Sequence, residues 1–143
     1  GHATGILLLD IDRFKEINDT YGHAVGDRVL QLSADRLREV ADAHDGIAAR
    51  LGGDEFVLVL PAIEAQLVDV ITDELLESLQ AFQIGGLDLT VGASIGVARG
   101  TGGVTDLLIN ADLALYQAKR TGRGQASTFR AEAAAFVSFV RER

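Results

Sequence analysis

The stretch Leu51-Gly52-Gly53-Asp54-Glu55-Phe56 joins two segments, 46–51 and 56–60, that the sequence predicts to be β-strands. Two consecutive glycines favour a tight hairpin, because glycine accepts positive φ and lets the backbone approach a ligand. The hairpin would then carry adjacent carboxylates at its tip, where they could hold a divalent cation and the phosphates bound to it. Two glycines followed by acids are also an ordinary turn, so this segment alone leaves both interpretations open.

Length and composition indicate a single domain. The chain has 143 residues, of which 48% are hydrophobic, enough to bury a core without disulfides. Cysteine is absent, which excludes a disulfide framework and a cysteine zinc site and fits a cytoplasmic protein. Its apolar runs fall far short of the roughly 20 residues that cross a bilayer, so we expect no membrane contact. The net charge of −8, with no basic face, argues against nucleic acid as a partner.

Hydrophobic patterning predicts the order β-α-β-β-α-β, followed by an added helix and strand. The first strand, 5–12, is an unbroken apolar run ending in acids, as is typical of a strand buried on both faces. This order is typical of an α+β, ferredoxin-like fold with an antiparallel sheet and helices on one face. We expect helices at 14–21, 24–43, 63–82, 104–121 and 131–143, and strands at 46–51, 55–61, 83–99 (a second hairpin or bent strand) and 125–129.

Acidic residues close the first strand. In the predicted fold this strand lies beside the hairpin, so Asp10 and Asp54 can meet although they are far apart in the sequence. Hard cations such as Mg²⁺ take one or two carboxylates together with substrate phosphates. Asp10 and Asp54 supply that set, Glu55 is a further ligand or proton acceptor, and the Ile11 carbonyl could complete it. Asp12 has the better claim to an ordinary role as a helix N-cap.

Two polar residues further along could recognise a base. Asn18 offers a donor and acceptors and Asp27 offers acceptors, which suits the N1–H and N2–H₂ edge of guanine, whereas adenine lacks those donors. The alternative is that Asn18 and Asp27 cap the two helices near them. His23 has no second histidine or cysteine at ligand spacing, so we expect it to form hydrogen bonds rather than bind a metal.

Two cations bracket Gly122 at the end of the helix predicted at 104–121. Lys119 and Arg123 could interact with the negative end of the helix dipole, or they could bind a triphosphate through charge-assisted hydrogen bonds. Sequence spacing does not separate these two roles.

Four segments together resemble the signature motifs of GGDEF domains, the bacterial diguanylate cyclases. They are LLLDIDRFKEINDTYGHAVGD (7–27), LGGDEF (51–56), SIGVA (94–98) and ADLALYQAKRTGRG (111–124). The resemblance implies a palm-like fold similar to nucleotidyl cyclases and polymerases. It also implies condensation of two GTP into cyclic di-GMP with release of two pyrophosphates. Each domain of this family binds one GTP, so catalysis needs two domains face to face.

The resemblance also implies a role for each matching position. The metal, Mg²⁺ or Mn²⁺, would be held by Asp10, the Ile11 carbonyl, Asp54 and Glu55. Guanine would be recognised by Asn18 and Asp27. The phosphates would be held by the backbone near Phe14 and Lys15 and by the side chains of Lys119 and Arg123. The full set of substrate-binding positions would be Phe14, Lys15, Asn18, His23, Asp27, Lys119 and Arg123. The catalytic positions would be Asp54, Glu55 and Lys119.

The chain departs from the family pattern in three places. The Arg-x-x-Asp motif that binds product and inhibits is replaced by Ala43 and Gly46, so that site is expected to be absent. The usual segment before the first strand is missing, so 1–143 is interpreted as one domain of a longer protein with sensory or EAL domains. Residues 130–143 weakly resemble a linker helix leading to an EAL phosphodiesterase. This leaves a second interpretation open, a GTP-binding module that regulates an attached phosphodiesterase.

Overall fold

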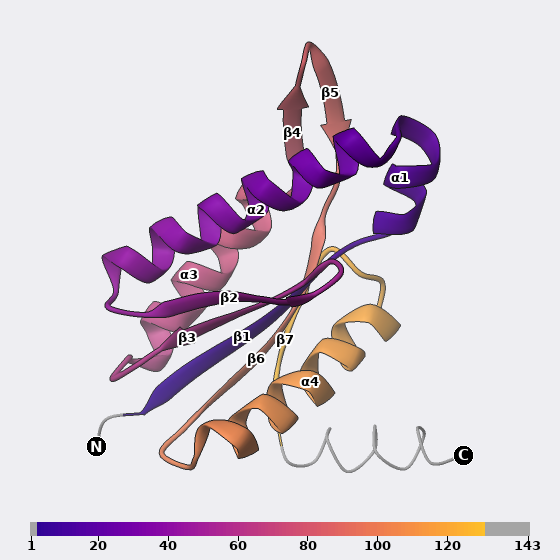
Figure 1. Cartoon of the computed structure of the whole chain (residues 1–143). Helices are drawn as coiled ribbons and strands as arrows, with labels where there is room; N and C mark the ends of the chain where they lie inside the picture. The colour runs from indigo at the N-terminus through magenta and orange to yellow at the C-terminus, as the bar shows by residue number, and fades with distance from the viewer. Residues whose placement is uncertain (1–2, 131–143) are drawn as a thin grey trace.

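The protein, as a computed structural model, is described over residues 3–130, which form an α+β domain built on one main sheet (Figure 1). Its strands pair in the order β2-β3-β1-β6-β7, and two short strands, β4 and β5, form a separate hairpin. The elements in chain order are β1 (Thr4–Ile11), α1 (Phe14–Tyr21), α2 (His23–Ala43), β2 (Ile47–Gly52), β3 (Glu55–Leu60), α3 (Ala65–Ser78), β4 (Ala81–Ile84), β5 (Leu87–Thr90), β6 (Ala93–Gly100), α4 (Val104–Arg120) and β7 (Ala126–Thr128).

The central strand β1 is buried on both faces, as its unbroken apolar run predicts. Leu7, Leu9 and Ile11 pack with α2 and α3 in one cluster, whereas Ile6 and Leu8 pack with α4 in another. The helices α2 and α3 of the β-α-β-β-α-β core therefore lie on one face of the sheet, as expected, and the added helix α4 covers the opposite face (Figure 1).

Gly96 on β6 explains how α4 comes so close to the sheet. A Cβ atom added at Gly96 would lie 2.1 Å from the Ala111 carbonyl oxygen and 2.3 Å from the Leu115 nitrogen. No other residue fits at that point without moving the helix backbone. The glycine therefore allows the middle of α4 to lie against the sheet, one turn before Lys119.

Two boundaries and one strand direction differ from the sequence prediction. The helix expected at 63–82 ends at Ser78, because the chain turns there and Phe82 becomes a buried residue of β4. The stretch expected to be one bent strand or hairpin at 83–99 contains the end of β4, then β5 and β6, which are separated at Gly92 (φ +118°). The final strand β7 pairs parallel to β6, so the sheet is mostly, not wholly, antiparallel. The expected final helix, with the linker it was thought to form, lies outside the described residues.

The register of the sheet brings distant acids together at one end. Asp10 on β1 is opposite Glu55 on β3 and opposite Ser94 on β6. The Ile11 N–H donates to the Asp54 carbonyl at 3.2 Å, which ties the end of β1 to the tip of the β2–β3 hairpin. Between residues 3 and 130, no helix combines the length and hydropathy needed to cross a bilayer.

Candidate active site

Three carboxylates meet where β1 ends and β3 begins. The Asp54 carboxyl group lies beside that of Asp10, which confirms the predicted meeting of these two residues. Burial, and then the neighbouring Asp54 carboxyl group, raises the pKa of Asp10, although Lys119 opposes the shift. Burial also raises the pKa of Glu55, with the negative charges of Asp10 and Asp112 adding to the effect. The site is therefore one where negative charges crowd together.

Lys119 reaches these acids from the last turn of α4. Its Nζ donates a hydrogen bond to Asp10 Oδ2, forming an ion pair that is largely shielded from solvent. Its position therefore favours a role at the acidic cluster over one confined to the helix dipole.

One carboxylate oxygen of the acidic cluster, which consists of Asp10, Asp54 and Glu55, is unpaired within the described residues. Asp10 Oδ1 is buried and has no hydrogen-bond partner among the described residues. A buried oxygen without a partner costs stability unless something binds it. No group of three or more His, Cys, Asp or Glu side chains within residues 3–130 has the arrangement of a metal centre. The candidate ligands here are instead few carboxylates plus backbone, and the assignment of Asp10, Ile11, Asp54 and Glu55 to a cation stays a prediction.

Asp12 does not cap a helix, so that part of the sequence interpretation is wrong. The N-cap of α1 is Arg13, which adopts a left-handed conformation (φ 53°), and no side chain caps it. Asp12 is buried instead, where its Oδ1 accepts from Ser94 Oγ at 2.6 Å and its Oδ2 accepts from the Gly124 N–H at 2.8 Å. It thereby fastens the loop after α4 to the end of β1, a role that the sequence analysis missed.

The loop fastened by Asp12 carries Arg123. This residue is exposed, has φ 61°, and donates its backbone N–H to the Ala118 carbonyl at 3.1 Å. On the other side of Asp12, Phe14 and Lys15 begin α1, where the first backbone N–H groups of a helix have no acceptor inside the helix. The predicted phosphate-binding positions thus flank one buried carboxylate, although their role stays a prediction.

The capping interpretation of Asn18 and Asp27 is also wrong. Asn18 lies within α1, and α2 begins after Gly22, with Asp27 one turn into the helix and no side-chain cap. Asn18 Oδ1 is buried without a hydrogen-bond partner in the described part of the chain, and a Cβ added at Gly26 would lie 1.8 Å from it. His23 is the exposed first residue of α2. Their predicted contacts with substrate remain predictions.

The positions of the inhibitory motif offer no charged side chains. Ala43 is exposed at the end of α2, and Gly46 lies in the turn before β2. A Cβ added at Gly46 would be 2.5 Å from the Val59 carbonyl oxygen, which is backbone and cannot swing away. The packing of the hairpin therefore excludes an aspartate here unless the chain shifts.

Comparison with known proteins agrees with the motifs and the fold. The family model described as "Diguanylate cyclase, GGDEF domain" matches residues 1–125. The chain is 44% identical over 122 residues to the bifunctional diguanylate cyclase/cyclic di-GMP phosphodiesterase MucR of Pseudomonas aeruginosa, covering 82% of this chain but 18% of MucR.

Solved structures show the same architecture. An EAL/GGDEF domain protein from M. capsulatus is 36% identical with a TM-score of 0.81, covering 91% of this chain and 86% of that one. The GGDEF domain of DgcB from Caulobacter crescentus, solved in complex with c-di-GMP, is 32% identical with a TM-score of 0.82, covering 90% of this chain and 76% of that one. With the motifs, the fold and the family model in agreement, the chain belongs to the GGDEF domain family.

Proposed function

We propose that this chain is a diguanylate cyclase that condenses two GTP into cyclic di-GMP and two pyrophosphates. The observation that carries the proposal is the meeting of Asp10, Asp54 and Glu55 at the end of the sheet, with Lys119 bonded to Asp10. Crowded carboxylates beside a cation are what metal-assisted phosphoryl chemistry requires. A domain that consumes GTP in this way would act in the cytoplasm.

The residues at the sheet end fit a divalent cation, Mg²⁺ or Mn²⁺. Asp10 Oδ1 is buried without a partner, and the pKa values of Asp10 and Glu55 are raised by burial and by neighbouring negative charge. The cation would be held by Asp10, Asp54, Glu55 and the Ile11 carbonyl. When bound, it would lower the pKa of a 3′-hydroxyl and neutralise phosphate charge.

The chain's own residues would bind and orient the nucleotide. The Asp27 carboxylate would accept hydrogen bonds from the guanine edge that carries N1–H and N2–H₂, and the Asn18 amide could both donate to this edge and accept from it. The free amides at Phe14 and Lys15 would bind phosphate oxygens, as helix N-termini do, and Arg123 would add charge-assisted hydrogen bonds. Lys119 would neutralise charge that develops on the transferred phosphate.

The reaction joins two nucleotides, and one domain carries one such set of residues. Two copies would therefore face each other, each presenting one GTP to the other. A monomer would bind GTP without completing the reaction, so the rate per mole of protein should rise with protein concentration.

Incubation with GTP and Mg²⁺, followed by chromatography of the products, tests the proposal. We expect cyclic di-GMP from the wild-type chain and from Asp35→Ala, which removes an exposed acid of α2. Asp10→Ala should give no product while retaining its helical circular dichroism. Cyclic di-GMP synthesis by folded Asp10→Ala would contradict the role of the acidic cluster. A specific activity that stays high and flat across a dilution series would contradict catalysis by two facing copies.

A second candidate is a GTP-binding module that regulates an attached EAL phosphodiesterase. An attached EAL domain is suggested by the M. capsulatus structure, which is described as an EAL/GGDEF domain protein. In that case the domain would bind GTP without forming product at any concentration. In the longer chain, GTP would then change the rate of cyclic di-GMP hydrolysis, and Asp27→Ala would remove that effect.

A further inference from the structure

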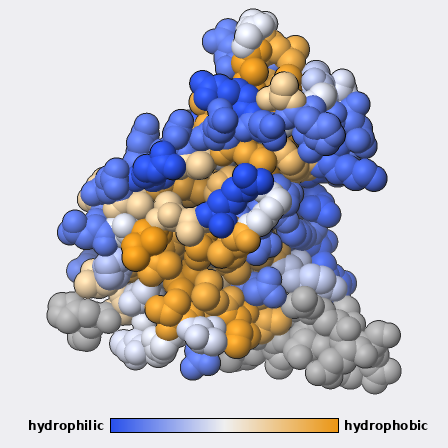
Figure 2. Space-filling model, viewed as in Figure 1, coloured by the Kyte–Doolittle hydropathy of each residue, from blue (hydrophilic) through white to orange (hydrophobic). Residues whose placement is uncertain are grey.

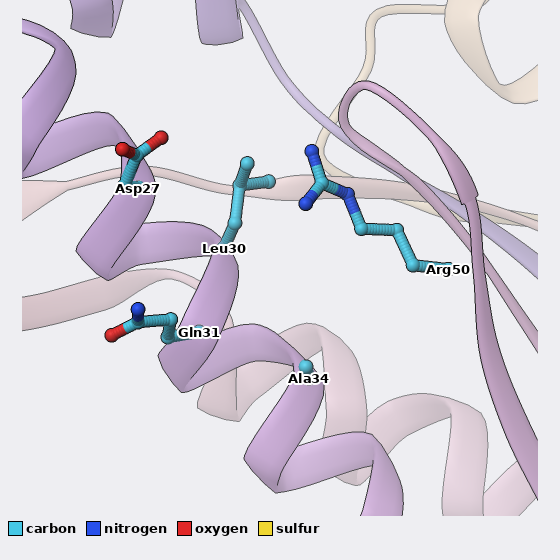
Figure 3. Close-up of a pocket in the computed structure, with 5 residues that line it drawn as sticks. All are labelled: Asp27, Leu30, Gln31, Ala34 and Arg50. Carbon is cyan, nitrogen blue, oxygen red and sulfur yellow. The ribbon is translucent and has the colours of Figure 1, made fainter.

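A cavity of about 360 Å³ lies between α2 and the hairpin strand β2 (Figure 3). About two turns of α2 line it with Asp27, Leu30, Gln31 and Ala34, and β2 contributes Arg50. Figure 3 shows the Arg50 guanidinium pointing from the hairpin toward Leu30 and Asp27, with the apolar Leu30 side chain between the two charged groups. The cavity therefore has an acceptor at one end, a donor at the other and an apolar surface between them.

Arg50 is held in this orientation by the hairpin itself. Its Nε donates to the Gly53 carbonyl at 2.8 Å, next to the irregular pairing between Arg50 and Gly52 where β2 meets the turn. Within residues 3–130 its two terminal nitrogens have no hydrogen-bond or ion-pair partner. A guanidinium fixed through Nε presents those two nitrogens as a planar fork, the geometry that binds two neighbouring acceptors at once.

A planar base with donors on one edge and acceptors on the other matches these two ends. Guanine has N1–H and N2–H₂ on one edge and the acceptors O6 and N7 on the other, and an arginine fork pairs with O6 and N7. Adenine places an N6–H₂ donor beside N7, which a guanidinium cannot accept. The acceptor at one end of the cavity and the donor at the other therefore both favour guanine over adenine.

We infer that Arg50 is a second guanine-recognition residue, which donates to O6 and N7 of the base whose opposite edge faces Asp27. The inference rests on the proposed function, because it requires GTP to bind at this face of α2. It assigns to Arg50 a role in base selection, distinct from phosphate binding by Lys119 and Arg123. The base would lie over Leu30, which is buried against the core and offers an apolar surface.

Titration calorimetry with GTP and with 7-deaza-GTP tests this inference. The analogue lacks only the N7 acceptor and keeps the phosphates and the N1–H and N2–H₂ edge. Ca²⁺ replaces Mg²⁺ so that binding is measured without turnover. We expect the wild-type chain to bind 7-deaza-GTP about 5- to 10-fold more weakly than GTP, because one hydrogen bond of the pair is lost.

The decisive measurement is the same comparison in Arg50→Ala. This variant should bind GTP on the order of 5- to 150-fold more weakly than the wild type. It should also bind GTP and 7-deaza-GTP equally, because the partner of N7 is gone. Arg38→Ala removes another exposed cation, on α2, that does not line this cavity, and it should keep the wild-type ratio.

The outcomes separate this inference from the proposed function. If Arg50→Ala weakens both nucleotides by the same factor, the arginine contacts another part of GTP, and the inference is wrong while GTP binding stands. If Arg50→Ala binds GTP as tightly as the wild type, the inference is also wrong. If the wild-type chain binds no GTP, the proposed function fails and the inference fails with it.

Discussion

Replacing Asp12 with alanine tests whether one buried carboxylate holds the loop after α4 against the sheet. Asp12 accepts from Ser94 Oγ at 2.6 Å and from the Gly124 N–H at 2.8 Å, bridging elements that are 82 and 112 residues away in the sequence. Ser94 is fully buried, whereas Gly124 is exposed, so the two bonds differ in what their loss costs.

The magnitude follows from that difference. Without Asp12, Ser94 Oγ stays buried without its partner, which costs about 1.5–3 kcal/mol for a hydrogen bond to a charged group. The Gly124 N–H can turn to water once the loop opens, so its bond contributes about 0.5–1.5 kcal/mol. The free energy of unfolding should therefore fall by about 2–4.5 kcal/mol. Asp19→Ala, which removes an exposed acid of α1, is the control and should change the stability little.

Chemical denaturation measures the stability, and GTP titration measures the effect on the loop. If Asp12 positions Arg123, then Arg123→Ala should weaken GTP binding less in the Asp12→Ala background than in the wild-type background. Two results would refute this reasoning. One is an unfolding free energy of Asp12→Ala equal to that of the wild type. The other is the same loss of affinity from Arg123→Ala in both backgrounds.

Three further predictions concern acids and turns. Because the folded-state pKa of Asp10 is raised, the metal-free domain should lose stability as pH rises from the usual carboxyl pKa through the raised one. Asp10→Asn, which mimics the protonated form, should reduce this loss of stability when chemical denaturation is measured with EDTA at pH 4 and pH 7. A pH dependence of stability equal to that of the wild type would contradict this prediction. In calorimetry, Asp27→Ala should weaken GTP binding roughly tenfold to a hundredfold and leave ATP binding unaffected, because a charged hydrogen bond is worth about 1.5–3 kcal/mol. Equal losses of affinity for GTP and ATP would point to a structural role for Asp27. Cyclic di-GMP should not bind at Ala43 and Gly46. Gly46→Asp should lower the unfolding free energy by about 1–3 kcal/mol, because its Cβ would meet the Val59 carbonyl. A Gly46→Asp chain as stable as the wild type would show that the hairpin can shift.

Much of the fold could be predicted from local sequence patterns. The apolar run of β1 identified the central strand, and Gly52 and Gly53 identified the hairpin, because each signal is set by a few adjacent residues. The meeting of Asp10 and Asp54 followed from the order of the elements, since that order places β1 beside β3.

The parts that could not be predicted depend on contacts between distant residues. Phe82 continues the apolar spacing of α3, yet it becomes a strand residue because the chain turns after Ser78 and pairs β4 with β5. Asp12 has the local signature of a helix cap, and only the folded chain brings Ser94 and Gly124 within reach of its oxygens. Local propensity was overridden in both cases by partners that no sequence window contains.

The packing of the sheet holds the carboxylates of the acidic cluster close together despite their mutual repulsion. Leu9 and Phe56, the residues just before Asp10 and just after Glu55, are paired across the strands and buried in the core, so the carboxylates cannot move apart without disturbing that packing. Lys119 bonds to Asp10 but brings one positive charge to a site with three acids, and the pKa values of Asp10 and Glu55 remain raised. A divalent cation would offset more of this repulsion than a single ammonium group can. The packing that holds the acids together therefore favours binding of such a cation over binding of a monovalent one.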